Sequence, residues 1–160
     1  MARGPYEERT RVYWVPSIAN KAAPTVAELN AGVDLSCFLT KDGLTEPSGQ
    51  NMTPAAALCE RHDAERVGST GGQVTMKMFR DDVDADDDAY NLCVYATNGF
   101  LVRRWGPLST AAWTAGQKVA VFPSEMHDPV MNDTAANTMA TFMETLAVTS
   151  QPNIRATVAA

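Results

Sequence analysis

The sequence predicts a mainly β fold, a β-sandwich or partly closed barrel with one or two short helices. Short segments rich in β-branched and aromatic residues recur along the chain, and turn signals containing Gly, Pro, Asn or Asp separate them. Neither internal repeats nor a composition shift marks a boundary, so residues 1–160 are expected to form one domain. Apolar residues make up 45% of the chain, enough for a core without disulfides or metal.

The N-terminal part predicts an arm, a strand and a helix, in that order. Residues 1–10 are polar and charged, which is typical of a flexible arm. Residues 11–15 are rich in β-forming side chains and are followed by a proline, so a short strand is expected. Thr25 and Glu28 have the spacing of a capping box, which predicts a helix of one or two turns.

Two further strands are expected on either side of a long loop. Apolar residues alternate with polar ones in residues 34–40, and the turn signal of residues 41–43 follows. Residues 43–72 show little periodicity, and a loop of this length in a compact domain is usually functional or disordered. Residues 73–80 alternate most clearly and predict a strand.

An acidic cluster at residues 81–88 precedes a segment with two interpretations. Acidic residues before a helix complement its dipole, which favours a short helix in residues 89–96. Asn98 and Gly99 instead form a hairpin signal, which would make residues 90–97 a strand. We favour the helix because three aspartates directly precede it.

The C-terminal part predicts three more extended segments. Residues 100–105 and 117–122 have strand character, and Pro123 marks a bend or a sheet edge. Residues 138–149 fit either a helix or a strand, and their threonines favour the strand. Residues 150–160 are expected to form an extended C-terminal arm.

The charge balance argues against tight binding of nucleic acid. The formal net charge is -6 with a pI near 4.8, and the densest cationic pair is Arg103 with Arg104. Proteins that grip DNA carry basic patches that replace phosphate counterions, whereas an acidic surface repels DNA. The apolar runs are also far shorter than the roughly 20 residues of a membrane span.

Calcium binding is the one metal chemistry that the acidic cluster suggests. The alternate spacing of Asp82, Asp84 and Asp86 fits a calcium loop, but the sixth position is Asp87 instead of Gly and the twelfth is Cys93 instead of Glu. A solvated acidic loop is therefore the favoured interpretation.

Catalytic motifs are not apparent. His62 and His127 lack a second histidine at ligand spacing, and there is no nucleophile elbow. The glycine-rich residues 68–72 lead into a strand, whereas phosphate-binding loops lead into a helix. We therefore expect no enzyme activity, no cofactor and no metal.

The cysteines and tryptophans are expected to serve packing. Three cysteines without metal-ligand spacing predict buried free thiols, at positions Cys37, Cys59 and Cys93. The tryptophans are favoured as core or subunit-interface anchors over stacking platforms for bases or sugars, at positions Trp14, Trp105 and Trp113.

Several segments together resemble a known family. Their order and spacing are similar to those of the major tail tube protein of long, flexible-tailed bacteriophages that infect actinobacteria, in residues 11–20, 24–32, 34–40 with 42–43, 79–82, 99–104 and 148–160. The resemblance implies a β-sandwich-like core of the tail-tube type flanked by a helix. It also implies hexameric rings whose inner sheets join into one barrel, and rings that stack into a hollow tube for the genome.

Partners and location follow from the same resemblance. The chain is expected to bind copies of itself and other tail proteins, namely the tape measure, tail terminator and distal tail proteins. DNA would pass through the lumen without specific binding, and no membrane is involved. The protein would be assembled in the host cytoplasm and reside in the virion tail.

The resemblance also suggests roles for particular residues. Residues 41–72 are expected to act as a stacking loop, and residues 1–10 and 150–160 as ordering arms. Candidate inter-subunit contacts are Trp14, Leu44, Met52, Trp105 and Trp113. A candidate acidic surface, facing either the lumen or the outside, is formed by Asp81, Asp82, Asp84, Asp86, Asp87 and Asp88.

Three other functions stay open at this point. A tail terminator or head-tail joining protein would form one ring that does not polymerise. A monomeric ligand-binding β-sandwich would use Trp105 or Trp113 to stack on a sugar. A metal-dependent enzyme is disfavoured because the chain holds two histidines.

Overall fold

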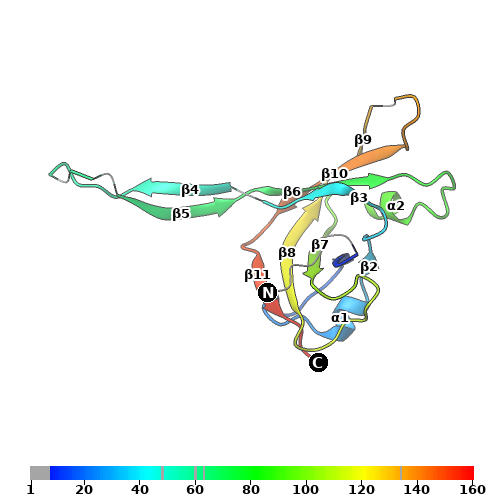
Figure 1. Cartoon of the computed structure of the whole chain (residues 1–160), viewed down its shortest axis with the longest axis horizontal. Coiled ribbons are helices and arrows are strands. Elements are labelled where there is room, and N and C mark those ends of the chain that lie inside the picture. The colour runs from blue at the N-terminus through cyan, green and yellow to red at the C-terminus, as the bar shows by residue number, and fades with distance from the viewer. Residues whose placement is uncertain (1–7, 48, 60, 63, 134) are drawn as a thin grey trace.

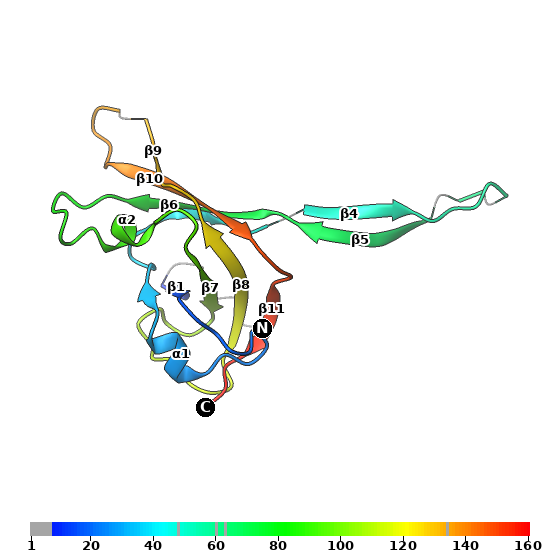
Figure 2. The same cartoon turned by 180° about the vertical axis from the view of Figure 1, so that it is seen from behind.

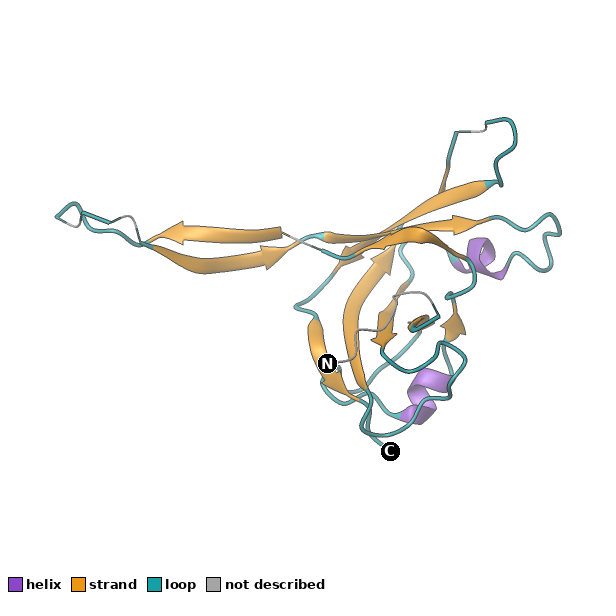
Figure 3. Cartoon of the chain, viewed as in Figure 1, coloured by secondary structure: helices purple, strands orange, loops and turns teal. Residues whose placement is uncertain are grey.

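The computed structural model describes residues 8–47, 49–59, 61–62, 64–133 and 135–160, and it confirms a mainly β chain with two short helices (Figures 1 and 3). The strands are β1 (Thr10–Val15), β2 (Val33–Asp34), β3 (Leu39–Thr45), β4 (Gly49–Pro54), β5 (Glu65–Gly71), β6 (Gln73–Phe79), β7 (Asn98–Trp105), β8 (Lys118–Met126), β9 (Val130–Met131), β10 (Thr141–Val148) and β11 (Asn153–Thr157). The helices are α1 (Val26–Asn30) and α2 (Asp88–Leu92).

One curled antiparallel sheet forms the body, and it does not close into a barrel. Its strand order is β2-β1-β7-β8-β10-β6-β3, while β11 pairs with β8 and β9 pairs with β10. Strands β3 and β6 continue into β4 and β5, which form a separate two-stranded sheet. This pair projects from the body as a long arm, visible from both sides in Figures 1 and 2.

The strands β1, β7 and β8 are buried on both faces, which explains their nearly continuous apolar sequences. In β1, Val12 and Trp14 pack in one core with residues of β6 and β10, whereas Tyr13 and Val15 pack in a second core on the other face. Helix α1 and β11 contribute to that second core. Burying one such side chain stabilises the fold by about 1.5–3 kcal/mol.

Helix α1 is nucleated by the capping box that the sequence predicts. The Thr25 hydroxyl accepts a hydrogen bond from the Glu28 N–H at 3.2 Å, and the Glu28 carboxylate accepts one from the Thr25 N–H at 2.7 Å. The apolar side of this helix places Leu29, which is fully buried, in the second core. The helix is thereby fixed against the face of β1.

Helix α2 confirms the helical interpretation of the segment after the acidic cluster. Only one of the two aspartates at its start acts on the helix dipole as expected. Asp88 lies in the first turn, where a negative charge complements the helix dipole. Asp87 occupies the N-cap position but makes no capping hydrogen bond, because its carboxylate binds Arg80 instead. The chain then turns before entering β7.

The prediction of one continuous strand in residues 34–40 is wrong, because β2 ends at Asp34 and β3 begins at Leu39. Residues 35–38 form a turn, in which Leu35 is fully buried and its N–H donates to the Val12 carbonyl at 2.9 Å. The chain leaves β2 there and crosses to β3 on the opposite edge of the sheet. The expected turn at residues 41–43 is also wrong: it is a bulge inside β3, where Gly43 approaches β6 so closely that a Cβ would lie 2.3 Å from the Lys77 carbonyl oxygen.

Two expectations near the C-terminal end are corrected, and one is confirmed. Pro123 lies inside β8, between the part that pairs with β11 and the part that pairs with β10, so its missing N–H falls where the ladder is interrupted. Residues 153–157 form β11, and Ala156 and Val158 are buried, so this segment is part of the core of the subunit instead of a free tail. Strand β10 confirms the extended interpretation of residues 138–149.

Candidate assembly surfaces

The described residues contain no group of His, Cys, Asp or Glu side chains that could hold a metal ion. His62 and His127 are both exposed, and the glycine-rich residues 68–72 lie in and next to β5, not at a helix start. Within the part of the chain that the structure describes, no helix is long and apolar enough to cross a membrane. The surfaces that stand out are instead strand edges and exposed apolar side chains.

The arm formed by β4 and β5 is exposed along nearly its whole length. Every residue of β4 is exposed, and so is every residue of β5 except Gly68. Met52, which lies opposite Val67, is 52% exposed, and Leu58 beyond the strands is fully exposed. A two-stranded ribbon is only marginally stable alone in water. Most described residues in the range 41–72 therefore lie in β3 or in the paired strands β4 and β5, not in the structureless loop that the weak periodicity suggests, and this pair offers apolar surface to a partner.

The acidic cluster is a solvated surface except at one position. Asp87 is fully buried and forms an ion pair with Arg80, so it does not belong to the acidic surface that the sequence predicts. Arg80 also stacks on Tyr90, with its guanidinium carbon 3.7 Å from the ring centroid. The other aspartates of the candidate surface are exposed, namely Asp81, Asp82, Asp84, Asp86 and Asp88.

A second buried carboxyl group lies beside helix α2. Glu144 of β10 is fully buried; its Oε1 accepts a hydrogen bond from the His127 N–H at 2.8 Å, and its Oε2 has no partner among the described residues. Burial raises the pKa of this carboxyl group to about 7, and the hydrogen bond from His127 offsets part of that effect. Desolvation disfavours the charged form of a carboxyl group. The sequence showed only a glutamate interrupting a strand.

The tryptophans divide into two buried anchors and one exposed side chain. Trp14 is 2% and Trp113 4% exposed, so in the subunit they are core residues with almost no surface to offer a neighbour. Trp105 at the end of β7 is 48% exposed. Of the three, only Trp105 can contact a partner or a ligand without rearrangement of the core.

A buried arginine fixes the loop that carries Trp113. Arg104 is fully buried, and its guanidinium donates hydrogen bonds to the carbonyls of Leu108, Ala111 and Ala112 at 2.7–3.2 Å. It also lies over the Trp113 ring, 4.8 Å from its centroid. The sequence marks Arg104 only as part of the densest cationic pair, because a single sequence does not distinguish an arginine in a satisfied core site from an exposed one.

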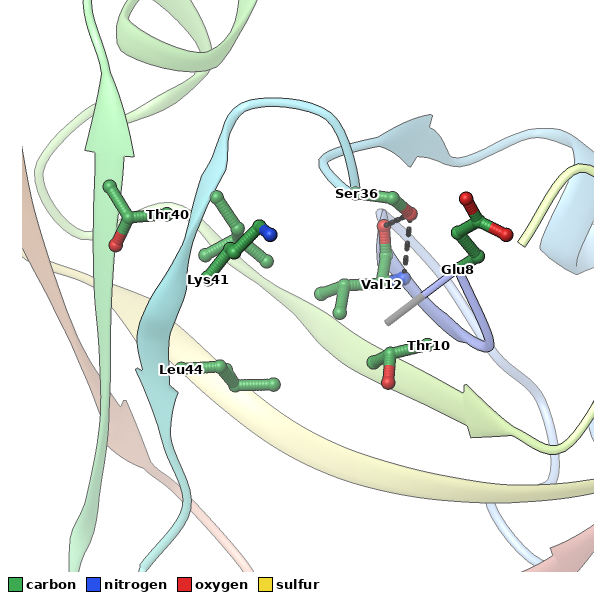
Figure 4. A pocket seen from close by; sticks show the side chains of 8 residues that line it. Glu8, Thr10, Val12, Ser36, Thr40, Lys41 and Leu44 are labelled. Carbon is green, nitrogen blue, oxygen red and sulfur yellow. Dashed lines mark hydrogen bonds between the residues drawn. The ribbon is translucent and has the colours of Figure 1, made fainter. Parts of the chain in front are cut away.

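A pocket of about 340 Å³ marks the seam between β1 and β3, at which the curled sheet stays open (Figure 4). Its apolar lining comes from Val12, Leu39 and Leu44, and Ser36 bridges its wall by accepting a hydrogen bond from the Val12 N–H at 2.9 Å. Leu44, one of the candidate contacts, is half-buried there. At this seam β1 and β3 approach each other, although they are not paired neighbours in the sheet.

The expectation of three buried thiols holds at one position only. Cys93 is buried and its thiol donates to the Ala89 carbonyl at 3.2 Å, whereas Cys37 and Cys59 are exposed. Cys37 lies in the turn that replaces the expected strand, and Cys59 lies beyond the arm strands. All three are free.

These features define a structural β protein with an exposed arm and strand edges. The phage tail tube protein family matches residues 1–160, so the chain belongs to this family and is a structural, non-enzymatic component of a phage tail. A search of curated proteins gave no match.

Among solved structures, the chain is similar to one from the cryo-EM structure of the anti-feeding prophage baseplate, 6-fold symmetrised. The two share 10% sequence identity with a TM-score of 0.57, and the match covers 96% of each chain. At this identity the likeness shows a shared fold.

Proposed function

We propose that copies of this chain assemble into stacked hexameric rings that form a hollow tail tube, through which DNA passes during ejection. The tube would belong to a long-tailed phage infecting actinobacteria, would be assembled in the host cytoplasm, and would contact the tape measure, tail terminator and distal tail proteins. The observation that carries the proposal is the family match over residues 1–160 combined with an arm that lacks a covering partner in the subunit.

The sheet edges support self-assembly into a closed ring. Exposed strand edges are sites of unwanted pairing, and a ring of identical copies removes them. The similar structure is described as 6-fold symmetrised, which fits six copies in a ring. The seam between β1 and β3 leaves the sheet of one subunit open, so neighbours can extend it.

The arm is proposed to connect one ring to the next. It projects far beyond the body, and its exposed Met52, Leu58 and Val67 would gain apolar burial on a neighbour. Met52, Leu44 and Trp105 keep their proposed role as inter-subunit contacts. Residues 1–10 and the exposed positions of residues 150–160 are proposed to order further contacts, and residues 1–7 lie outside the described residues.

The charge suits a channel for DNA. A net charge of -6 keeps DNA from adsorbing to the tube wall, since like charges repel. The exposed aspartates of residues 81–88 are proposed to contribute to this acidic surface. Asp87, being buried, is not part of that role.

The test is removal of the arm. Gly49 and Gly71 face each other at its base, so residues 50–70 can be replaced by Asn-Gly, a pair suited to a two-residue hairpin turn. We expect a folded subunit whose circular dichroism shows a β protein, and electron microscopy should show isolated rings where the wild type forms tubes. Tubes of normal length from this variant would contradict the stacking role, and a wild type that forms rings but never tubes would indicate a terminator-like protein.

A further inference from the structure

A groove of about 830 Å³ lies where the arm leaves the body, between the arm and β11. Its walls combine small polar residues with apolar side chains, including Val67, Val148 and Ile154. Glu46 is the one charged side chain among the described residues that line it, and that carboxylate forms an ion pair with Arg103. The groove is therefore concave, partly apolar and close to neutral, a composition suited to receiving a protein segment.

Three cations lie along β11, the strand whose Ile154 lines this groove, and they are called the basic rim below. Lys21 donates to the Gln151 carbonyl at 2.8 Å at the start of the segment, Arg155 is exposed on β11 itself, and Lys118 binds the Thr157 hydroxyl near its end. No ion pair of these three cations is present among the described residues. Residues 145–160 contain no Asp or Glu, so no side-chain carboxylate of that segment neutralises the rim.

The end of the molecule opposite the arm carries a protruding segment with exposed apolar and acidic side chains, which complement the groove and its basic rim. Strand β9 and the segment leading to β10 protrude there, as Figure 1 shows. Four large apolar side chains of this protrusion are exposed, namely Val130, Met131, Met139 and Met143. Asp128 and Asp133 are exposed in the same segment, and the exposed aspartates of residues 81–88 precede the adjacent helix α2.

We propose that the β9–β10 protrusion of one copy docks in the groove between the arm and β11 of a second copy. The pairing places a convex, apolar and acidic segment against a concave surface with apolar walls and a basic rim, and charge complementarity of this kind fixes the register of a contact. Because the two surfaces lie at opposite ends of the subunit, the contact is head to tail and repeats from copy to copy. The inference rests on the proposed self-assembly and names the surfaces that carry it.

Charge reversal on both sides tests the contact. We expect Arg155→Asp and Asp133→Arg each to lower the assembled fraction about tenfold in sedimentation at moderate salt. The double variant should recover assembly, because it restores opposite charges. Ser17→Arg, which adds a charge at an exposed position between β1 and α1 that belongs to no proposed contact, is the control and should assemble like the wild type. Single variants that assemble normally, or a double variant that does not recover, would overturn the proposal.

Disulfide trapping tests the same contact without requiring complete tubes. In a Cys37→Ser, Cys59→Ser background, protein carrying Met139→Cys is mixed with protein carrying Ile154→Cys and then oxidised. A cross-linked heterodimer that forms faster than either homodimer supports the proposal. Tubes that form without this cross-link would contradict the docking contact and leave the tail tube function standing, whereas a subunit that stays monomeric and uncross-linked would contradict both.

Discussion

Asp87 and Glu144 are fully buried acidic residues near helix α2, and each has one oxygen without a hydrogen-bond partner among the described residues. Cys93 lies close to both, and burial raises the pKa of its thiol, with the two carboxyl groups adding to that effect. Buried polar groups that lack partners are costly. Single substitutions at the two carboxyl groups can therefore test how much their polar contacts contribute to the stability of the region around α2.

Replacing Asp87 should destabilise the fold, whereas replacing its neighbour Asp86 should not. Asp87→Asn weakens the ion pair with Arg80 inside the protein, for which we expect a loss of about 1–3 kcal/mol in the free energy of unfolding. Asp86 is exposed, so Asp86→Asn should change that free energy by less than about 0.5 kcal/mol. Denaturant unfolding of the arm-deleted subunit measures both. Equal stability of the two variants would show that the Asp87–Arg80 pair contributes nothing.

Glu144 should make stability fall as the pH rises toward neutrality. Its pKa is raised from 4.5 to about 7, so between these values the folded protein binds a proton that the unfolded chain has released. The unfolding free energy then decreases with pH, in total by roughly 3 kcal/mol, and the loss is complete above the folded pKa.

Glu144→Gln keeps a side-chain oxygen that can accept the hydrogen bond from the His127 N–H, but it removes the ionisable carboxyl group. In unfolding experiments from pH 5 to pH 8, we expect the wild type to lose stability relative to this variant. Parallel pH profiles for the two proteins would mean that Glu144 does not titrate in this range.

At the scale of elements, the sequence predicted correctly those helices and strands that depend on neighbouring residues. The capping box of α1 and the alternation of β6 depend on neighbouring residues, and both are found where expected. The turn at residues 35–38 could not be predicted from alternation, because Leu35 is buried by a contact with Val12, far away in the sequence. Strands β4 and β5 were missed because strands exposed on both faces carry no apolar periodicity.

The candidate inter-subunit contacts also divide into what the sequence can indicate and what depends on contacts between distant residues. The sequence identifies Trp105 and Met52 as residues worth testing, and exposure leaves them available. It could not separate them from Trp14 and Trp113, because burial of a tryptophan depends on the whole sheet. The groove beside β11 brings together residues from four stretches of the chain that are far apart in the sequence, and no one stretch carries a signature of it.

Proline substitutions should separate the body from the arm. Met76 lies in β6 between β10 and β3, so Met76→Pro removes a backbone donor from the middle of the sheet and should abolish folding, at a cost of about 3 kcal/mol or more. Met52→Pro alters β4 in the arm and should leave the body folded. Tryptophan fluorescence and circular dichroism measure both. A folded Met76→Pro variant would show that β6 is not central to the sheet.

At the scale of the whole molecule, the subunit has features that one copy cannot satisfy. Its sheet is open at the seam between β1 and β3, its arm is exposed on both faces, and apolar side chains protrude at the opposite end. Solvent-exposed apolar surfaces of this kind mark sites of association. Identical neighbours arranged in rings and stacks would cover all of them.

The most direct test of this account is electron cryo-microscopy of particles assembled from the purified wild-type protein. We predict hollow tubes of stacked hexameric rings, with each arm lying on a neighbouring ring and each β9–β10 protrusion in the groove of a neighbour. A protein that stays monomeric at every concentration, or a tube in which the arm points freely into solvent, would contradict it.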